Sequence, residues 1–337
     1  MESVSVIVPS YNRAPLLPAS LTSLFRQTVP VHEVILVDDG STDDTPAALE
    51  RFRVEHPEWR DRLRVLRQAN HGKPVAVNRG LEIATGVWVG FNDSDDVWLP
   101  HKLETQLAVL HRFPESAACV SNTYWDQTND TLFDQAEENL TEVAALIPDA
   151  PELFVRRRHG ILMQTALVRR EIVHAIGGFD PELRIGQDFD FLFRTSLRTP
   201  MCYTKEPLVR LNRDPDDAHR LTAVAPANSE KRLRAHHYML RQWAPLVPRH
   251  APRLQALLRR KRAENASALA NLCLASGRTE EAKAFMREAV AILPSGSRRA
   301  KLVLMRCAPQ LMSAFRRRPK EIAPTARPSG RRARVAS

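Results

Sequence analysis

The chain is predicted to be an α/β protein with a mostly parallel sheet covered by helices, followed by a helical appendage and a basic tail. Short apolar, β-branched runs alternate with helical periodicity over the first hundred residues, which is typical of βαβ units. From about Asn228 the composition shifts to Ala, Leu and Arg at helical spacing. These observations predict domains over residues 1–225 and 226–315. The Arg, Pro and Ser content then predicts a disordered tail over 316–337.

The first βαβ unit begins near the N-terminus. The run Val4–Val8 is short and β-branched, as expected of a buried strand, and we expect Pro9 to end it. A helix is expected over Ala14–Gln27, where four apolar residues recur at helical spacing: Leu17, Leu21, Leu24 and Phe25.

The second strand is predicted over Val34–Val37, another apolar run. Either Ser41 or Thr42 should cap the helix that follows. Asp43 and Asp44 would then lie in its first turn, where carboxylates interact favourably with the helix dipole.

The alternation continues to residue 113. Leu63–Leu66 and Val87–Phe91 are apolar runs of strand length. Helices are expected over Pro74–Ala84 and Pro100–Phe113, each beginning with a proline, which suits the first turn of a helix. Strands and helices at this spacing favour a sheet covered on both faces.

The rest of the chain is less uniform. Residues 122–160 are expected to form loops and short elements, and residues 161–211 return to mixed α/β character. Residues 266–294 are predicted to form two helices around Gly277, similar to one tetratricopeptide-type hairpin. Since repeat arrays need about three units, a helical appendage is favoured over a peptide-binding array.

Charge and cysteine content exclude several classes of protein. The formal charge of +10 lies in residues 298–337, which hold twelve Lys or Arg and one acid, while the body is nearly neutral. A neutral body argues against a nucleic-acid enzyme with a basic channel. Four cysteines without CxxC spacing argue against metal fingers and redox pairs, and suit a reducing compartment. No secretory signal or membrane-spanning run is expected, so the predicted location is cytoplasmic.

Common catalytic motifs are missing from the sequence. GxGxxG and GxxxxGK[ST] are absent, which argues against the usual dinucleotide-binding and P-loop classes. HExxH and GxSxG are absent as well, which argues against zinc proteases and nucleophile-elbow hydrolases.

Carboxylates follow two of the predicted strands. Asp38–Gly40 ends the second strand and Asp93–Asp96 follows the fourth. In parallel α/β sheets, ligands bind beyond the carboxyl ends of the strands. Asp39 is therefore a candidate for recognising a nucleoside through hydrogen bonds, although Asp-Gly after a strand is also ordinary turn chemistry.

The second acidic segment and a third motif predict chemistry at the same edge. Three carboxylates within Asp93–Asp96 repel one another unless a cation lies among them. A divalent cation shared with diphosphate oxygens would satisfy them, and a solvated acidic loop is the alternative. The third motif, Gly186–Asp188, opens a predicted helix, where Asp188 is either a helix cap or a general base facing the same cleft.

Taken in order, these motifs resemble the family 2 glycosyltransferases, which have the Rossmann-like GT-A fold of nucleotide-diphospho-sugar transferases. The resemblance covers about the first 215 residues. The segments that carry it are Val4–Asn12, Ser23-Leu24, Gln27-Thr28, Val37–Asp43, Asn70–Lys73, Ala76–Asn78 with Gly80, Ala84–Gly86 and Asp93–Asp96.

The resemblance implies roles for residues that bind the donor. Pro9, Tyr11 and Asp39 match positions that hold the nucleoside, with Asp38 beside them. Lys73 matches a basic position near the phosphates.

It also implies a metal site and a base. Asp93 and Asp95 match the DxD motif that engages the nucleotide-sugar and a Mg²⁺ or Mn²⁺ ion, with Asp95 as the direct ligand. Asp188 matches the aspartate of the family's Glu-Asp motif, the proposed general base, although the preceding glutamate is Gln187 here.

A second departure concerns a family Arg-x-His pattern, which is Arg210–Asn212 in this chain. Three possibilities follow for the metal shell. Asn212 supplies an oxygen ligand, His219 serves from the following loop, or the metal lacks this ligand.

The implied activity is that of a hexosyltransferase-type enzyme. It would move a sugar, with inversion, from a nucleotide-diphosphate donor to an acceptor hydroxyl in polysaccharide, glycolipid or cell-surface glycan synthesis. The resemblance alone favours UDP-sugars. One alternative is a non-catalytic, degenerate transferase that acts as a binding protein, which Gln187 and Asn212 would support. The other is a sugar-phosphate nucleotidyltransferase, but Pro9–Arg13 lacks the Gly-rich loop usual in that class.

The basic C-terminal segment 298–337 predicts a further partner. Apolar residues between arginine clusters in 298–318 could lie on an anionic membrane, which would place the protein at the inner face of the cytoplasmic membrane near a lipid-linked acceptor. The alternative is a terminal helix packed on the body and followed by a solvated tail, and Pro309 would interrupt a longer helix.

Overall fold

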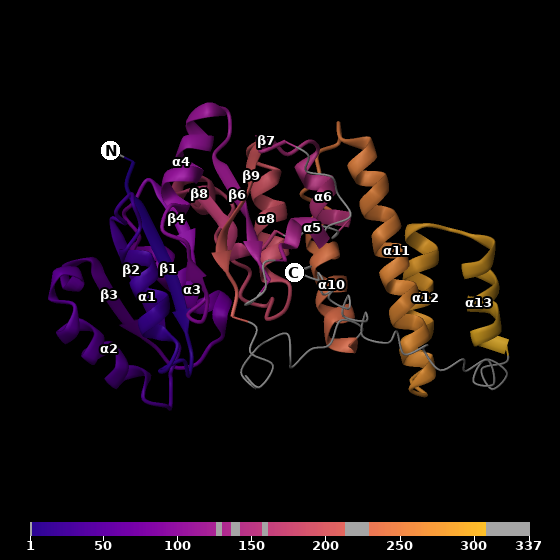
Figure 1. Ribbon diagram of the computed structural model, residues 1–337. Coiled ribbons are helices and arrows are strands. Elements are labelled where there is room, and N and C mark those ends of the chain that lie inside the picture. The colour runs from indigo at the N-terminus through magenta and orange to yellow at the C-terminus, as the bar shows by residue number, and fades with distance from the viewer. Residues whose placement is uncertain (1, 126–129, 136–141, 157–160, 213–228, 308–337) are drawn as a thin grey trace, which may run out of the picture. The chain divides into compact units, whose positions relative to one another are not determined.

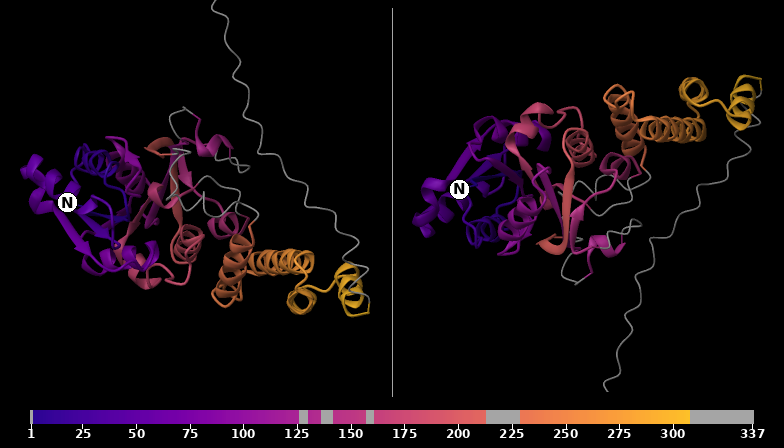
Figure 2. Two further views of the ribbon diagram at one scale, coloured as in Figure 1. Left: turned by 90° about the horizontal axis from the view of Figure 1, so that it is seen from below. Right: turned by 90° about the horizontal axis from the view of Figure 1, so that it is seen from above.

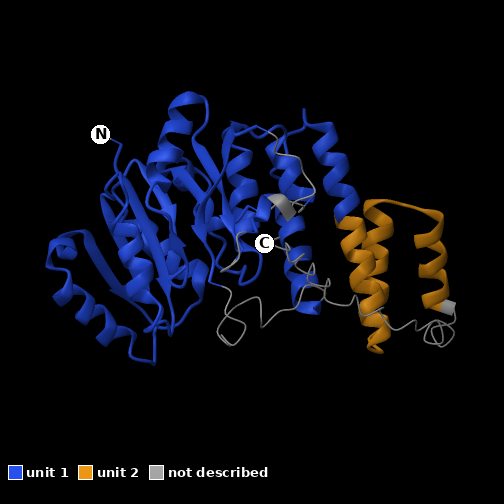
Figure 3. Ribbon diagram, in the orientation of Figure 1, with its two compact units in different colours: residues 1–261 blue, residues 262–337 orange. Residues whose placement is uncertain are grey.

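Figure 1 shows the computed structural model of the protein. The structure describes residues 2–125, 130–135, 142–156, 161–212 and 229–307. The chain divides into two compact units, residues 1–261 and 262–337 (Figure 3). The predicted domain boundary at residue 225 falls within the undescribed residues 213–228, and the tail predicted to be disordered, 316–337, also lies outside the described part.

Unit 1 is built on one nine-stranded sheet with the order β3-β2-β1-β4-β8-β6-β9-β5, in which β7 also pairs with β9. Its strands are β1 Val4–Ser10, β2 Glu33–Asp38, β3 Leu63–Arg67, β4 Trp88–Phe91, β5 Val97–Trp98, β6 Ala118–Tyr124, β7 Ala144–Leu146, β8 Ala166–Arg169 and β9 Met201–Arg210. Strands β1 to β4 are parallel to one another. The rest of the sheet is mixed, because β8 is antiparallel to both β4 and β6, while β9 is parallel to β6. The predicted α/β class is confirmed, with the parallel part confined mainly to the first four strands.

Helices cover both faces of this sheet (Figures 1 and 2). They are α1 Leu17–Phe25, α2 Thr45–Glu55, α3 Lys73–Ile83, α4 Lys102–Arg112, α5 Leu132–Gln135, α6 Ala150–Arg156, α7 Arg170–Ala175, α8 Gln187–Ser196 and α10 Glu230–Trp243, with short 3-10 helices η1 Pro57–Arg62 and η2 Met163–Thr165. Side chains alternate across β1: Ile7 packs in a core with α3 and α8, whereas Val6 and Val8 pack in a second core with α1, α2 and α4. This two-sided burial explains why the strands are continuous apolar runs.

Two local predictions in the first βαβ units were wrong. Pro9 does not end β1, because the strand continues to Ser10 and Pro9 pairs in register with Val37. The carbonyl of Ser10 accepts from the N–H of Asp39, which follows β2, and the carbonyl of Ile7 accepts from the N–H of Asn92, which follows β4. Because successive residues of a strand turn their backbone groups to opposite sides, the backbone nitrogen of Pro9 faces β4. The ladder with β4 ends at Ile7 and Phe91, so the missing N–H of Pro9 leaves no gap in it.

The helix after β2 begins later than predicted. It starts at Thr45, and neither Ser41 nor Thr42 caps it. These residues instead bond to the loop after β1: the Asn12 backbone N–H donates to Ser41 Oγ at 2.9 Å, and the Thr42 N–H donates to Asn12 Oδ1 at 2.8 Å. The hydrogen bonds of this segment join two strand ends, which the local sequence does not show.

Strand β6 lies partly in the segment that was predicted to be irregular. The overlap contains Asn122 and Thr123, and both are buried. The Asn122 amide donates to the carbonyl of Lys205, and Thr123 Oγ1 donates to that of Val209. Cross-strand bonds to β9 therefore stabilise polar residues that local periodicity assigns to a loop.

Unit 2 contains three helices in its described part. The second half of α11 Pro252–Ala275 is followed by a turn at Gly277, then by α12 Thr279–Ile292 and α13 Gly296–Cys307. Small and sulfur-containing side chains form its core, among them Ala270, Cys273, Met286 and Met305. In the described part of the chain, no helix has the length and apolar character needed to cross a bilayer.

Candidate active site

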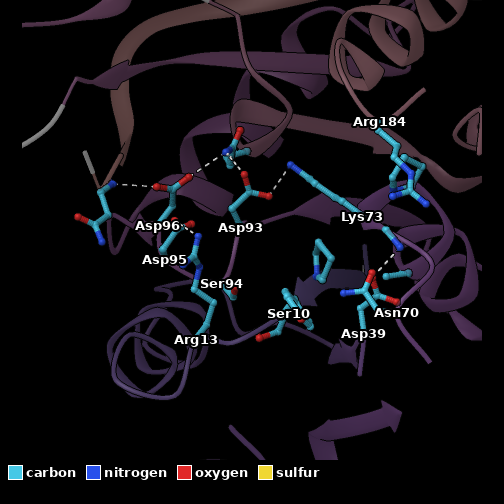
Figure 4. A pocket seen from close by; sticks show the side chains of 17 residues that line it. Ser10, Arg13, Asp39, Asn70, Lys73, Asp93, Ser94, Asp95, Asp96 and Arg184 are labelled. Carbon is cyan, nitrogen blue, oxygen red and sulfur yellow. Dashed lines mark hydrogen bonds and ion pairs between the residues drawn. The ribbon is translucent and has the colours of Figure 1, made fainter. Parts of the chain in front are cut away.

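A cavity of about 340 Å³ opens where the first strands of the sheet end (Figure 4). Its walls come from the segments after β1, β2 and β4, from the start of α3, and from single residues far along the chain. The lining residues are Pro9, Ser10, Tyr11, Arg13, Asp39, Asn70, Gly72, Lys73, Pro74, Ala76, Asp93, Ser94, Asp95, Asp96, Gln164, Arg184 and Asn212. The structure thus brings together most of the predicted site residues: Pro9, Tyr11, Asp39, Lys73, Asp93 and Asp95.

Three carboxylates converge at this cavity. Oxygens of Asp93, Asp95 and Asp96 lie within 4.8 Å of one another. Lys73 Nζ is 2.6 Å from Asp93 Oδ1, and an Arg13 guanidinium nitrogen is 3.5 Å from Asp95 Oδ2. Figure 4 shows these two cations approaching the acidic residues from different sides. Protein cations therefore reduce the repulsion that the sequence predicts.

Amide groups hold two of these carboxylates more firmly. Gln164 Nε2 donates to Asp93 Oδ2 at 2.6 Å and to Asp96 Oδ2 at 2.8 Å. The backbone N–H of Asn212 donates to Asp96 Oδ1 at 2.8 Å. Both oxygens of Asp96 thus accept from the protein, whereas Asp95 is held by a longer ion pair. Its carboxylate can exchange that partner for a ligand more easily.

Burial changes the proton affinities of these groups. Burial opposes the charge of Lys73, but the carboxylates of Asp188 and Asp93 outweigh it and raise the lysine pKa, so Lys73 is protonated. Burial raises the pKa of Asp95, and the negative charge of Asp93 adds to this effect. A cation placed among these groups would relieve that repulsion.

Asp188 lies in the first turn of α8, whose N-cap residue Gly186 has a positive φ of 82°. Its Oδ1 is 3.9 Å from Lys73 Nζ and accepts no hydrogen bond. Burial raises the pKa of Asp188, although Lys73 favours its charged form. Asp188 is not among the lining residues, but Lys73 links it to Asp93 at the acidic cluster. A carboxylate with a raised pKa is suited to accept a proton.

The other end of the cavity is formed by the turn after β2. Asp39 Oδ1 accepts from Gln68 Nε2 at 2.8 Å and from the His71 N–H at 2.9 Å, and Oδ2 accepts from the Gly72 N–H at 2.7 Å. Asp39 lines the cavity, but its carboxylate also holds the loop that leads into α3.

Asp38 lies outside the cavity lining. Its Oδ1 accepts from the Ser41 N–H at 2.9 Å, and its Oδ2 pairs with Arg67 at 3.4 Å. The next residue, Gly40, has a φ of 77°, and a Cβ there would lie 2.9 Å from Asn70 N. The Asp38–Gly40 turn is therefore packed closely against the loop at Asn70.

Sequence analysis assigned no site role to several lining residues, among them Arg13, Asn70, Gln164 and Arg184. Arg13 directly follows the motif Val4–Asn12, and Asn70 lies inside the motif Asn70–Lys73. Their positions in or next to these motifs could have identified both residues from the sequence. Gln164 and Arg184 lie in η2 and just before α8, in no motif. His219, one of the alternatives for the metal shell, lies outside the described residues.

The fold and this cleft together define a class of protein. Acidic residues paired with cations at the carboxyl ends of parallel strands, on a sheet that becomes mixed beyond β4, are the arrangement of a GT-A nucleotide-sugar transferase. The family model described as glycosyl transferase family 2 matches residues 5–175. The chain belongs to this family and is a glycosyltransferase.

Curated relatives agree with this assignment. A relative from Mycobacterium tuberculosis, named PGL/p-HBAD biosynthesis glycosyltransferase, is 42% identical over 205 residues, which are 61% of this chain and 71% of the relative. An uncharacterized glycosyltransferase of Nostoc sp. is 28% identical over 244 residues, covering 71% of this chain and 74% of the relative.

Solved structures share the fold at low sequence identity. Staphylococcus aureus TarS 1–349 in complex with UDP-GlcNAc superposes with a TM-score of 0.64 at 19% identity, covering 90% of this chain and 87% of that one. The mannosyltransferase PcManGT of Pyrobaculum calidifontis, in complex with GDP-Man and Mn²⁺, gives a TM-score of 0.53 at 22% identity, covering 93% and 86%. Both confirm the GT-A architecture.

Proposed function

We propose that this glycosyltransferase moves a hexose from a nucleotide-diphosphate donor to an acceptor hydroxyl with inversion at the anomeric carbon. One observation carries the proposal: Lys73 contacts both Asp93, at 2.6 Å, and Asp188, at 3.9 Å. A group that can stabilise a leaving diphosphate and a group that can accept a proton are thereby joined in one site. Such an arrangement suits a single displacement, without a covalent intermediate.

The donor is a nucleotide-sugar, and we propose a UDP-sugar. TarS was solved with UDP-GlcNAc and PcManGT with GDP-Man, so this fold accommodates both kinds of donor. Pro9, Tyr11 and Asp39 line the end of the cavity next to β1 and β2 and would contact the nucleoside. Lys73 and Arg13 lie at the acidic end, where cations would meet the diphosphate.

The acidic residues fit a metal ion by the chemistry of their donor atoms. Carboxylate oxygens within 4.8 Å of one another are the hard ligands that Mg²⁺ and Mn²⁺ prefer. Asp95 and Asp93 would hold the ion. When bound, it would supply positive charge against the diphosphate leaving group.

Asp188 would act on the acceptor. Its carboxylate is the group proposed to take the acceptor hydroxyl proton, since the side chain keeps 20% of its surface exposed although Oδ1 itself is buried. Burial keeps the pKa of Asp188 raised, which makes the carboxylate a stronger base than an exposed aspartate. Lys73 would stabilise the carboxylate before the proton arrives.

A donor screen tests the proposal. Purified protein is incubated with UDP-, GDP- and dTDP-sugars, Mn²⁺ and a mixture of hydroxyl acceptors, and the release of nucleoside diphosphate is measured. We expect metal-dependent release from at least one donor, and an inverted anomeric configuration in the isolated product by NMR. Absence of release from every donor, or binding of UDP without turnover, would favour the alternative of a binding protein.

The structure also supports a membrane-proximal acceptor through α13. Its inner face packs in the unit 2 core through Met305 and Leu302. Its outer face exposes Val303 and Leu304, at 56% and 47% of their surface, in a helix that carries basic but no acidic residues. Apolar side chains flanked by cations suit an anionic lipid surface. We propose that the enzyme docks there to reach a lipid-linked or cell-surface glycan acceptor.

Vesicle cosedimentation tests the docking. We expect the full chain to sediment with phosphatidylglycerol vesicles at low salt and far less with phosphatidylcholine vesicles. The V303D/L304D variant should bind about tenfold more weakly, because charge replaces the apolar stripe. V54D/L246D is the matched control, since Val54 and Leu246 are also exposed. Equal binding of the wild type and V303D/L304D would contradict the proposal.

A further inference from the structure

A buried lysine on α4 has no role in the mechanism above. Lys102 is fully buried, and its Nζ lies 4.1 Å from the centre of the Trp98 ring. Among the described residues, no carboxylate forms an ion pair with it. Burial lowers the pKa of Lys102 to about 7. A buried amine without a counterion lowers the stability of the fold, so its presence calls for another explanation.

Among the described residues, the side chain of Lys102 has one hydrogen-bond acceptor, the side-chain oxygen of Gln106 one helical turn further along α4. Gln106 is also buried, and its Nε2 donates to two backbone carbonyls, that of Cys119 at 3.1 Å and that of Thr165 at 2.8 Å. The amide group of Gln106 is thus engaged at both ends, which fixes its orientation. Through Gln106, the lysine is connected to β6 and to the 3-10 helix η2.

The helix η2, like Lys73, lies next to both the acidic cluster and Asp188. Gln164 donates from η2 to Asp93 at 2.6 Å and to Asp96 at 2.8 Å. The backbone of Met163, also in η2, lies close enough to Asp188 to favour the charged form of its carboxyl group and so to lower its pKa. The residue that Gln106 holds, Thr165, directly follows Gln164 in the chain.

We propose that Lys102 and Gln106 are positioning residues, which orient η2 and thereby hold Gln164 against the acidic cluster. Neither residue lines the cavity, so both act through Gln164. Active sites commonly retain groups that lower stability where they hold a functional geometry. This inference rests on the proposed transferase function, because its test uses the kcat of sugar transfer. The hydrogen-bond network itself does not depend on which sugar is transferred.

A double-mutant cycle tests the connection. K102M keeps a long apolar side chain but cannot donate to Gln106. We expect it to lower kcat about tenfold and to weaken binding of UDP with Mn²⁺ about threefold, while Tm stays equal or rises. In a Q164L background, each of these penalties should fall below about twofold, because the residue through which Lys102 acts is already lost. Q106M should behave as K102M does, and L103M, a conservative change at the buried neighbour on the same helix, is the control.

Two outcomes would overturn the proposal. Penalties of equal size in the wild-type and Q164L backgrounds would show that Lys102 does not act through Gln164. Losses of kcat and binding that follow a fall in Tm, for both K102M and Q106M, would show a role in folding alone. If the wild type releases no nucleoside diphosphate from any donor, the proposed function fails, and the cycle measured on UDP binding decides the positioning role by itself.

Discussion

Two acidic turns lie at the same edge of the sheet and differ in how their carboxylates are held. In the turn after β2, Asp39 accepts three hydrogen bonds from one neighbouring loop, two of them from backbone N–H groups. In the turn after β4, Asp93 and Asp95 face the side-chain cations Lys73 and Arg13.

This difference indicates that the turn after β2 maintains the shape of the site, whereas the turn after β4 takes part in its chemistry. Backbone donors are fixed by the fold, so the carboxylate of Asp39 serves as an anchor for the loop before α3. Side-chain cations can move, so the carboxylates after β4 are able to exchange a cation for a metal ion or release it to a phosphate group. Four substitutions test this comparison.

The largest effect is expected for D95A. Loss of the main metal anchor should reduce turnover by about 10³-fold or more, because the diphosphate charge is left uncompensated. Tm should stay unchanged or rise slightly, since Asp95 is destabilised by burial and by Asp93. Nucleoside diphosphate release and a thermal melt measure both. A large fall in Tm would mean that Asp95, like Asp39, is a structural anchor.

D188N should lower kcat by about 10²–10⁴-fold while the affinity for the donor is kept, because only the proton acceptor is lost. Burial raises the pKa of Asp188, so the acidic limb of the wild-type kcat profile should lie above the usual aspartate range. That limb should be missing from the residual activity of D188N. Donor affinity that falls in parallel with kcat would show that Asp188 is misassigned.

A third acidic group, at the opposite end of β2, provides a purely structural reference. Glu33 bonds to Ser5, Arg64 and Thr85. Burial opposes its charge, but these hydrogen bonds prevail and lower the pKa of Glu33 from 4.5 to about 2. The stabilisation is therefore present above pH 4.5 and is lost as pH falls toward 2, by about 3 kcal/mol.

E33Q should lose this pH dependence without any effect on kcat. Urea unfolding between pH 2 and 5 measures the free energy of unfolding of both proteins. The two curves should converge at the acidic end. Curves that stay parallel over this range would contradict the structural role of Glu33.

Among the cavity residues, the smaller effect is expected for D39A, which should act on both stability and donor binding. The three donors of the loop would lose their acceptor, at a cost of about 1.5–3 kcal/mol in the free energy of unfolding. The KM for the donor should rise roughly tenfold, with kcat unchanged. Donor kinetics and urea unfolding test the two parts. An unchanged KM together with a lower stability would leave Asp39 as an anchor without a part in recognising the nucleoside.

The parallel half of the fold could be predicted from sequence because its signals are local. The strand at Val34–Val37 and the helix at Pro74–Ala84 are close to β2 and α3 as the structure has them. Ordered strand ends then placed Asp39 and Asp93 at one edge, since parallel strands end on the same side. Sequence analysis failed where residues depend on partners far away: the buried polar half of β6 bonds to β9, 83 or more positions along the chain.

By itself, the sequence determined the α/β class, the family and the acidic residues at the strand ends, because apolar periodicity and contiguous motifs are written within short stretches of chain. Only the tertiary structure decided which residues complete the site. Gln164 donates a hydrogen bond to Asp93, 71 positions away in the sequence, and the Asn212 N–H donates one to Asp96, 116 positions away. It also decided that Lys102 points inward to Gln106 and is not a solvated charge at the start of α4. The physical reason is that such contacts arise from packing of distant elements, which leaves no periodicity or spacing in the sequence.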